Sequence, residues 1–407
     1  INAAEAYERA YTPENRPPEM MAKLADINIM LNQYEKAETF NAAFLATSPN
    51  DPDGGLRAAN LKRWRGDHET AKDIQKSYWE KSPQHSGLIT ALLDDKDDAP
   101  LGNAIALSDD ASASLVERRR VSFALARHYD RKGDVENAWH YAERANSLYD
   151  EPYADLSREE AWVEKAVNLY KTLPQNGPNA AKLIYVMGPP RCGGSLLQTV
   201  LAQANDVVSV GERGALLSWL IPALGNTEVL KQQTAQLAKA DIAGMKRADG
   251  EARIYVDKTS PHILIAGLLA KIHSGAQFVI PTRNAGDMAV SMFFHDFSTN
   301  FLYTRSIAGI KDYLLLQDEA AQAWSEAGLA IIDHDHDSFV SNPEAAGEAL
   351  FNALGLEWSP SVLETGGKGT VVRTFSSRQV RGGVSKAYQG RGERYAEFLS
   401  KAGFNRE

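Results

Sequence analysis

The sequence predicts a two-domain protein of α+α/β class, in which an α-helical repeat domain precedes an α/β domain with a central parallel sheet. Three observations support this fold class. The 407 residues exceed what one hydrophobic core normally serves. A helical pattern repeats over the first part of the chain, and short apolar runs alternate with helical patterns over the rest. We place the helical domain at residues 1–178 and the α/β domain at residues 179–407.

The composition is that of a globular protein, with 43% hydrophobic, 24% charged and 9% aromatic residues. The formal net charge of −9 argues against a general nucleic-acid coat and against a polybasic membrane binder. Most of the acidity belongs to residues 1–178, which hold 22 basic and 30 acidic side chains, whereas the remainder holds 22 and 23. We therefore expect no nucleic-acid partner.

Cysteine content and hydropathy indicate the compartment. Cys192 is the single cysteine, so the chain forms no internal disulfide and no cysteine-based zinc site. No apolar run approaches the roughly 20 residues that a membrane span requires, and Ile1–Arg16 is too polar for a signal peptide. We expect a cytoplasmic protein without a membrane span. Removal of a leader before Ile1 stays open, because the chain does not begin with Met.

A 34-residue period runs through the helical part. Two similar segments, Gln33–Ala37 and Gly66–Ala71, end in alanines that lie 34 residues apart. The dipeptides Ser48-Pro49 and Ser82-Pro83 are separated by the same 34 residues. A third copy of the Gly66–Ala71 segment ends at Ala138, 67 residues after Ala71. This pattern, with a small residue where two helices touch and a proline after the second helix, resembles that of tetratricopeptide repeats, which are stacked helix pairs. An ordinary helical bundle is the alternative.

The helical domain also contains a break and an end. The acidic segment Leu93–Asp110 interrupts the period, which indicates an irregular or missing half of a repeat. Lys171–Ala180 concentrates Pro, Gly and Asn and marks the domain boundary. Stacked repeats usually present a concave surface, so we expect this domain to dock a protein partner or a second copy of the chain.

A strand, a glycine-rich loop and a helix open the α/β domain, at Leu183–Met187, Gly188–Ser195 and Leu196–Ala204. Glycines let backbone N–H groups approach phosphate oxygens, and the helix N-terminus adds positive potential, so this is a P-loop-like phosphate site. A merely tight turn is the alternative. When this loop is aligned with the NTPase loop GxxxxGK[ST], Gly194 stands at the position of the lysine. The absence of this cation at the loop argues against hydrolysis of a nucleoside triphosphate.

Four ionisable residues follow four predicted strands. Because the carboxyl ends of parallel strands form the ligand site of such sheets, we expect Arg191, Glu212, Lys258 and Arg283 to meet there. The strands after the first are predicted at residues 207–210, 253–256, 277–280 and 330–332.

The loop resembles that of the sulfotransferases, and the order of domains is similar to tetratricopeptide-repeat-containing sulfotransferases whose catalytic domain is akin to tyrosylprotein sulfotransferases. In that family a loop of the form G-x-P-R-S-G-T-T-L binds the 5′-phosphosulfate of 3′-phosphoadenosine 5′-phosphosulfate (PAPS). Gly188 to Leu196 matches it, with Cys192 in place of Ser and Gly194 in place of the first Thr. The resemblance implies that this loop contacts PAPS through Arg191, Cys192, Gly193, Gly194, Ser195 and Leu196.

Two further elements extend the resemblance. In the family, an R-x-P-x-D element and a Ser that follows it bind the 3′-phosphate. This element is matched here by Arg283, Asp287 and Ser291, with Ala285 in place of the Pro. A segment resembling S-x-x-Q-V-R implies further cofactor contacts from Ser377, Arg381 and Gly382. This segment precedes the Gly390-Arg391 stretch. Residues 366–407 hold 9 basic and 3 acidic residues. Such a positive charge is expected of a lid that closes over a polyanion, and the alternative is a solvated basic tail.

The resemblance also implies catalytic roles. Transfer of a sulfuryl group needs a base for the acceptor hydroxyl and cations for the leaving oxygen, without a metal. Glu212 resembles the family's general base, and Lys258 and Arg191 are the cations. His262 is the rival base, and His295 is an additional candidate for the 3′-phosphate site. Cys192 at a helix N-terminus has the setting of a lowered thiol pKa, which would suit a nucleophile.

Several alternatives stay open. The run from Asp333 to Asp337 has the appearance of metal ligands, but we expect no metal. The hydroxyl acceptor, whether peptide tyrosine, glycan, lipid or small alcohol, is not legible, and aromatic residues between Phe293 and Tyr303 indicate an apolar entrance or core packing. The rival functions are a P-loop nucleotide-dependent phosphotransferase and a non-catalytic repeat scaffold with a relic nucleotide site.

Overall fold

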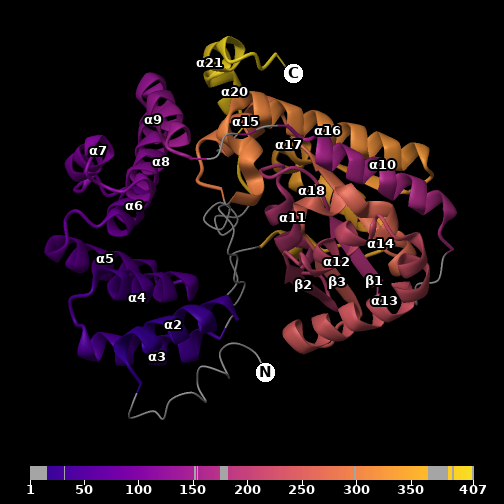
Figure 1. The fold of residues 1–407 in the computed structure, drawn as a ribbon, viewed down its shortest axis with the longest axis horizontal. Helices are drawn as coiled ribbons and strands as arrows, with labels where there is room; N and C mark the ends of the chain where they lie inside the picture. Colours follow the sequence, from indigo (N-terminus) through magenta and orange to yellow (C-terminus); the bar gives the residue numbers. More distant parts are fainter. Residues whose placement is uncertain are drawn as a thin grey trace. The chain divides into compact units, whose positions relative to one another are not determined.

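The chain forms two compact units, residues 1–150 and residues 151–407 (Figure 1). The computed structural model describes residues 16–31, 33–150, 153, 155–174, 182–297, 299–364, 384–386 and 389–405.

In the described ranges, unit 1 consists of helices, and consecutive helices pack in pairs: α2 with α3, α4 with α5, and α8 with α9 (Figure 1). This is the helical architecture expected for the first part of the chain. The helices are α2 (Pro18–Met30), α3 (Tyr34–Thr47), α4 (Pro52–Trp64), α5 (His68–Lys81), α6 (Ser86–Asp94), α7 (Leu101–Asp109), α8 (Leu115–Lys132) and α9 (Val135–Ser147).

The repeated Gly-Asp sequence forms the turn between paired helices. Gly66 and Gly133 have φ of 90° and 79°, a conformation that glycine adopts without steric cost. Asp67 and Asp134 then cap α5 and α9, because each carboxylate accepts the backbone N–H three residues further on, at 3.2 and 3.1 Å. The second and third copies of the pattern, 67 residues apart, therefore form the same kind of helix turn.

The acidic segment Leu93–Asp110 contains α7, a helix of 9 residues, between the longer pairs. Its aspartates serve as partners for cations on neighbouring helices, which explains their density. The pairs are Asp94 with Arg127 (3.0 Å), Asp95 with Arg63, Asp97 with Lys72 (3.6 Å) and Asp98 with Lys132 (2.8 Å).

Unit 2 is built on a five-stranded sheet in the order β2-β3-β1-β4-β5, in which every neighbouring pair is parallel. The central parallel sheet predicted from the alternation of strands and helices is thus confirmed. β1 lies in the middle, and the chain crosses to one side for β2 and β3 and to the other for β4 and β5. The strands are β1 (Lys182–Val186), β2 (Val207–Gly211), β3 (Ile254–Asp257), β4 (Gln277–Thr282) and β5 (Ile331–Asp335).

The two faces of the sheet are covered differently. Ile184 and Val186 of β1 belong to an apolar core with α11, α17 and α18. Tyr185 points to the other face, where it stacks on Phe278 at 5.5 Å and meets His262 edge-on at 5.4 Å. Between and after the strands lie α11 (Gly194–Leu201), α12 (Ala215–Ala223), α13 (Thr227–Asp249), η2 (Ser260–Ile265), α14 (Ala266–Ile272), α15 (Ala285–Phe293), η3 (Thr299–Arg305), α16 (Ile307–Glu326), α17 (His336–Ser341), α18 (Pro343–Leu354) and η4 (Pro360–Leu363).

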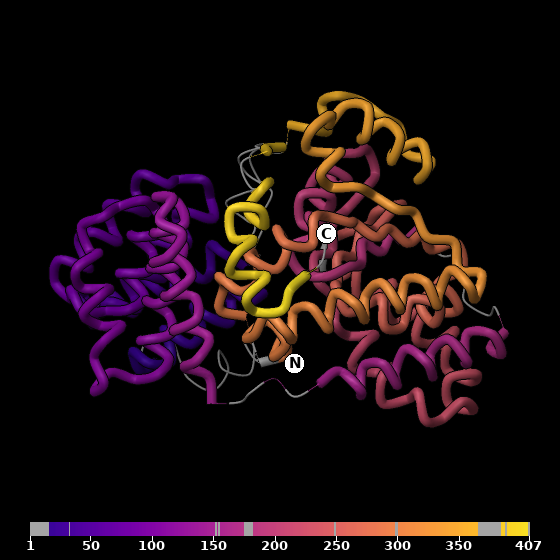
Figure 2. Tube along the Cα trace, turned by 90° about the horizontal axis from the view of Figure 1, so that it is seen from above, coloured from indigo at the N-terminus to yellow at the C-terminus, as the bar shows by residue number. Residues whose placement is uncertain are grey.

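The C-terminal helices α20 (Arg391–Arg394) and α21 (Ala396–Lys401) return to this unit, where α20 packs on α15. Figure 2 shows this yellow segment alongside the orange helices. A Cβ on Gly392 would lie 2.8 Å from the carbonyl carbon of Gly286, so only paired glycines allow this approach. The C-terminal segment is therefore close to the beginning of α15.

Helix α10 (Ser157–Thr172) belongs to unit 2, whereas the division at residue 178 assigns it to the helical domain. It packs against η2, α14 and α16. Its Tyr170 ring meets Trp324 at 6.0 Å, and both rings lie against Gly267, where a Cβ would come within 2.4 Å of Trp324. A continuous helical pattern hides this boundary in the sequence, because the change of partner occurs between two helices.

None of the helices in the described ranges combines the length and the apolar character that a membrane span requires.

We predict that a fragment of residues 151–407 folds, whereas a fragment of residues 179–407 is strongly destabilised. The shorter fragment lacks the buried side chains of α10, among them Val163, Val167 and Leu169, each worth about 1.5–3 kcal/mol on burial. Thermal unfolding of the two purified fragments measures the difference. Equal midpoints would show that α10 adds nothing to unit 2.

Candidate active site

All five strands of the sheet end at one edge, and a loop or an ionisable side chain follows each of them. The loop Gly188–Gly193 follows β1, Glu212 follows β2, Lys258 follows β3, Arg283 follows β4 and His336 follows β5. The chain reverses its direction of winding at β1, and ligands of such sheets bind at the carboxyl ends of the strands at this point. The strand-end placement predicted from the sequence is confirmed.

The loop after β1 has the backbone geometry of an anion cradle. Gly188, Arg191 and Gly193 have φ of 138°, 72° and 99°, and such alternation turns successive N–H groups toward one point. A Cβ on Gly193 would lie 2.1 Å from Nδ1 of His336, so this position requires glycine. Gly193 is also the N-cap of α11, whose first N–H groups have no partner within the helix.

Arg191, Ser291 and Arg283 form one hydrogen-bonded group. Arg191 Nε donates to Ser291 Oγ at 2.7 Å, and Arg283 Nη1 donates to the backbone oxygen of Arg191 at 3.0 Å. Ser291 is 2% exposed. The structure therefore brings together the loop arginine and two residues that lie about 100 positions later in the chain.

Asp287 holds this group together from α15. Its carboxylate lies 3.6 Å from Arg283 Nη2 and accepts the backbone N–H groups of Gly390 (3.0 Å) and Gly392 (2.6 Å). The Asp287 and Arg283 side chains are 2% and 6% exposed. Since a buried charge is tolerated only when it is paired and hydrogen-bonded, Asp287 both neutralises Arg283 and attaches α20.

Arg391 is a site residue that the motif comparison did not select. It is 6% exposed, its guanidinium lies 5.5 Å from the Phe294 ring centroid, and it follows Gly390 in the segment held by Asp287. Burial lowers the pKa of Arg283, and the nearby Arg391 acts in the same direction. The available signal was an arginine between two glycines in the basic C-terminal segment.

Glu212 and Lys258 form an ion pair at the ends of β2 and β3, with Lys258 Nζ donating to Glu212 Oε1. The Glu212 side chain is 52% exposed and that of Lys258 is 13% exposed. A Cβ on Gly194 would lie 3.5 Å from Lys258 Cγ, so the lysine stem runs over the position where an NTPase loop carries its own lysine. The pair therefore combines an accessible carboxylate with a cation close to the loop.

Burial disfavours two of the alternative reactive groups. Burial raises the pKa of the Cys192 thiol, opposite to the lowered pKa expected at a helix N-terminus, so the thiol stays protonated and unsuited to nucleophilic attack. His262 is fully buried against Tyr185, and burial lowers its pKa to about 3. Neither group offers an ionised or accessible atom to a substrate.

The residues after β5 have structural partners. Asp335 caps α17 by accepting the N–H groups of Asp337 (2.9 Å) and Ser338 (3.2 Å). Asp337 accepts the Asn284 N–H at 2.8 Å, and burial, reinforced by Arg283, lowers the pKa of His336 to about 4. Over the described ranges, His, Cys, Asp and Glu form no group of three or more that could hold a metal ion.

Helix α15 accounts for the remaining candidates. His295 Nδ1 donates to the backbone oxygen of Ser291 at 2.7 Å. Phe293, Phe294 and Tyr303 are at most 5% exposed, so they are core residues and not an entrance. Ser377, Arg381 and Gly382 lie outside the described residues.

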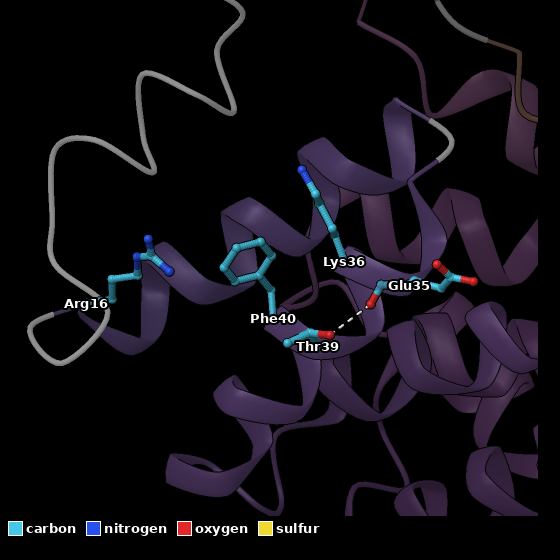
Figure 3. A pocket seen from close by; sticks show the side chains of 5 residues that line it. All are labelled: Arg16, Glu35, Lys36, Thr39 and Phe40. Atoms are coloured by element: carbon cyan, nitrogen blue, oxygen red, sulfur yellow. Dashed lines mark hydrogen bonds between the residues drawn. The ribbon is translucent and has the colours of Figure 1, made fainter. Parts of the chain in front are cut away.

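A separate pocket of about 310 Å³ lies in unit 1 and is lined by Arg16, Glu35, Lys36, Thr39 and Phe40 (Figure 3). Its hydrogen bond joins Thr39 Oγ1 to the Glu35 carbonyl (2.9 Å) within one helix, and Arg16 lies 5.6 Å from the Phe40 ring centroid. These are contacts of a helix surface, so the candidate active site is the strand-end edge of unit 2.

Comparison with known proteins shows which family part of unit 2 resembles. Residues 184–360 match the model of the sulfotransferase family. An uncharacterised protein of Aquifex aeolicus (strain VF5) is 23% identical to this chain over 315 residues. The match covers 70% of this chain and 40% of the Aquifex protein. A solved sulfotransferase of Mycobacterium tuberculosis H37Rv aligns with 73% of this chain and 97% of its own at 14% identity, with a TM-score of 0.29, a likeness too loose to carry an argument.

Residues 184–360 of unit 2 are thus similar to the sulfotransferase family, and this likeness supports a transferase activity. Members of this family generally use PAPS as the sulfuryl donor.

We predict that Asp287→Ala lowers the free energy of unfolding by about 3–5 kcal/mol, because it leaves Arg283 buried without its carboxylate. Urea-induced unfolding measures the effect. Glu397→Ala is the matched control, since Glu397 pairs with Lys401 on an exposed surface, at 75% and 69% exposure, where such pairs contribute about 0–1 kcal/mol. A loss no larger than that of the control would refute a structural role for Asp287.

Proposed function

We propose that this chain is a PAPS-dependent sulfotransferase that moves the sulfuryl group to a hydroxyl acceptor by in-line transfer, with Glu212 as general base. One observation carries the proposal: the accessible Glu212–Lys258 pair shares a sheet edge with a phosphate-type loop and a cluster of buried arginines, inside a domain that matches the sulfotransferase family. Glu212 and Lys258 supply proton acceptance and charge stabilisation, and the rest supplies anion binding.

The residues present fit a nucleotide with phosphates at both ends. The loop from Arg191 to Leu196 offers backbone N–H groups at a helix N-terminus, which suits the 5′-phosphosulfate. Arg283, Ser291 and Arg191 offer guanidinium and hydroxyl donors, which suit the 3′-phosphate. Arg391 extends the same cationic region. The Arg191–Ser291 hydrogen bond connects the two anion sites, so we assign Arg191 to both.

Glu212 accepts the proton of the acceptor hydroxyl while the acceptor oxygen forms its bond to sulfur. The bond between sulfur and the leaving phosphate oxygen breaks at the same time, and Lys258 stabilises the charge that develops on that oxygen. PAPS supplies the sulfuryl group. Glu212 suits this role because its carboxylate is half-exposed and touches Lys258.

His262 does not suit the role of base. An imidazole whose pKa lies near 3 is a weak proton acceptor at neutral pH, and this ring is fully buried and meets Tyr185 edge-on. We therefore retain Glu212 alone as the base.

We propose further that unit 1 serves as a docking domain of tetratricopeptide-like helix pairs, for a protein partner or a second copy of the chain, and that the protein acts in the cytoplasm. The paired helices and their repeated Gly-Asp turns support the first proposal.

We predict that Glu212→Gln lowers kcat for sulfuryl transfer by about 10²- to 10⁴-fold, the usual contribution of a general base. Binding of 3′,5′-diphosphoadenosine is expected to be unchanged, because Glu212 lies outside the arginine cluster. Radiolabelled PAPS, tested with a primary alcohol, a phenol, a sugar and a tyrosine peptide, identifies the acceptor and gives kcat. The control is Glu251→Gln, an 80% exposed carboxylate that pairs with Lys246.

We predict that Arg191→Gly weakens binding of 3′,5′-diphosphoadenosine by about 10- to 100-fold, the effect of losing charged hydrogen bonds, without loss of stability. Glycine accepts the positive φ of residue 191, so the loop keeps its shape while the guanidinium is removed. Calorimetry measures the affinity, with Arg253→Ala, an 85% exposed arginine, as control. Tight magnesium-dependent ATP binding without 3′,5′-diphosphoadenosine binding would instead favour a phosphotransferase.

A further inference from the structure

A buried polar cluster lies beneath the ends of β2 and β3, and the transfer step described above uses none of its members. Asp257 is 3% exposed, His262 is fully buried and His273 is 2% exposed. The cluster joins the sheet to η2, α13 and α14. Its members are Tyr185, Arg213, Asp241, Asp257, Thr259, His262 and His273.

Two hydrogen bonds in this cluster connect the neighbours of the catalytic pair. Thr259 Oγ1 donates to Asp257 Oδ1 at 2.6 Å, and the backbone N–H of Arg213 donates to Thr259 Oγ1 at 2.8 Å. Arg213 directly follows Glu212, and Thr259 directly follows Lys258. The relay Asp257–Thr259–Arg213 therefore ties the turn that carries Glu212 to the strand that carries Lys258.

A second attachment holds the same turn from α13. Arg213 Nη2 lies 3.4 Å from Asp241 Oδ1, and Asp241 Oδ2 lies 3.1 Å from His273 Nε2. A Cβ on Gly244 would lie 3.0 Å from Arg213 Nη2, so a glycine one turn after Asp241 leaves room for the guanidinium. The backbone N–H of Lys258 also donates to the Gly211 oxygen at 2.9 Å.

We propose that Asp257 is a positioning residue for Glu212: its buried carboxyl, through Thr259 and the Arg213 N–H, fixes the turn that places Glu212 against Lys258. This inference rests on the proposed role of Glu212. Asp257 touches no substrate and acts only through the residues that follow the catalytic pair.

Burial favours the neutral form of the Asp257 carboxyl. Burial is the main cause that raises the pKa of Asp257 to about 8, and the nearby carboxylates of Asp241 and Glu212 act in the same direction. The hydrogen bond from Thr259 and the positive charge of Arg213 lower this pKa. The titratable groups near it are Glu212 and Arg213 after β2, Lys258 after β3, Asp241 of α13, His262 of η2, His273 after α14 and Tyr185 of β1. Ionised Asp257 would add a second buried negative charge beside Asp241 and face Glu212.

The same proton contributes to stability. An aspartate in the unfolded chain has a pKa of about 3.9, so the folded protein holds an extra proton between that pH and about 8. Stability from this group is therefore complete at low pH and is lost as pH rises through this interval. The substitution Asp257→Asn introduces an amide that cannot titrate, and the oxygen of this amide can still accept the Thr259 hydroxyl.

The experiment compares Thr259→Val, Thr259→Ser and Asp257→Asn in the full chain, with Ser218→Ala, an exposed hydroxyl of α12, as control. Thr259→Val should speed hydrogen exchange of the Arg213 amide by about tenfold or more and lower kcat by about 10- to 100-fold, the range for a misplaced catalytic group. Its KM for PAPS should stay within about threefold of the wild type, because the anion-binding residues are untouched. Thr259→Ser should restore both values.

Asp257→Asn should remain active, with a kcat that persists above pH 8, and its melting temperature should fall less between pH 5 and pH 8 than that of the wild type. Unchanged Arg213 exchange in Thr259→Val, or a wild-type pH dependence of melting in Asp257→Asn, would overturn the proposal. If the wild type itself transfers no sulfuryl group to any acceptor class, the proposed function fails, and the exchange and melting data still decide whether the relay exists.

Discussion

The buried contact between Asp287 and Arg283 is the interaction on which the rest of the anion site depends. A guanidinium that is 6% exposed needs a carboxylate beside it, and this carboxylate also receives two backbone N–H groups from the C-terminal segment. One side chain on α15 therefore fixes the cation after β4, orients that cation toward the loop after β1, and attaches α20. Arg391 becomes part of the site because Asp287 anchors the residues on both sides of it.

The distribution of charge explains how an acidic chain builds such a site. The net charge of −9 belongs mainly to residues 1–178, where the aspartates of the acidic segment pair with cations of neighbouring helices. In unit 2 the cations of the candidate site are placed by topology, since parallel strands deliver their following residues to one edge. Buried guanidinium groups act in a medium of low effective dielectric, so a few of them attract an anion more strongly than many solvated lysines.

The sequence predicts the sheet and the positions of the strand-end residues well, because both follow from local patterns. Lys258 and Arg283 stand directly after apolar runs, and the glycines of the loop are required by its positive φ angles. Burial is where sequence reasoning fails. Cys192 directly follows Arg191 and His262 lies four residues after Lys258, but both side chains are buried. Long-range contacts, such as that between α20, which carries Arg391, and α15, cannot be read from local sequence patterns.

The geometry divides the site into two parts with different exposure, and this division follows from the strand order. After β1 and β4, Arg191, Ser291 and Arg283 are hydrogen-bonded to one another, and the Arg283 side chain is buried beside Asp287. At β2, the edge strand, the carboxylate of Glu212 is half-exposed. A donor nucleotide bound by the first part would lie across the middle of the sheet, and an acceptor would have to approach from the β2 side.

Because β2 ends in a bulge and in Gly211, which has a positive φ, the position of Glu212 depends on the residues that contact this turn. The buried relay of Asp257 and Thr259 supplies that support, so precision at the exposed part of the site comes from residues that no substrate touches.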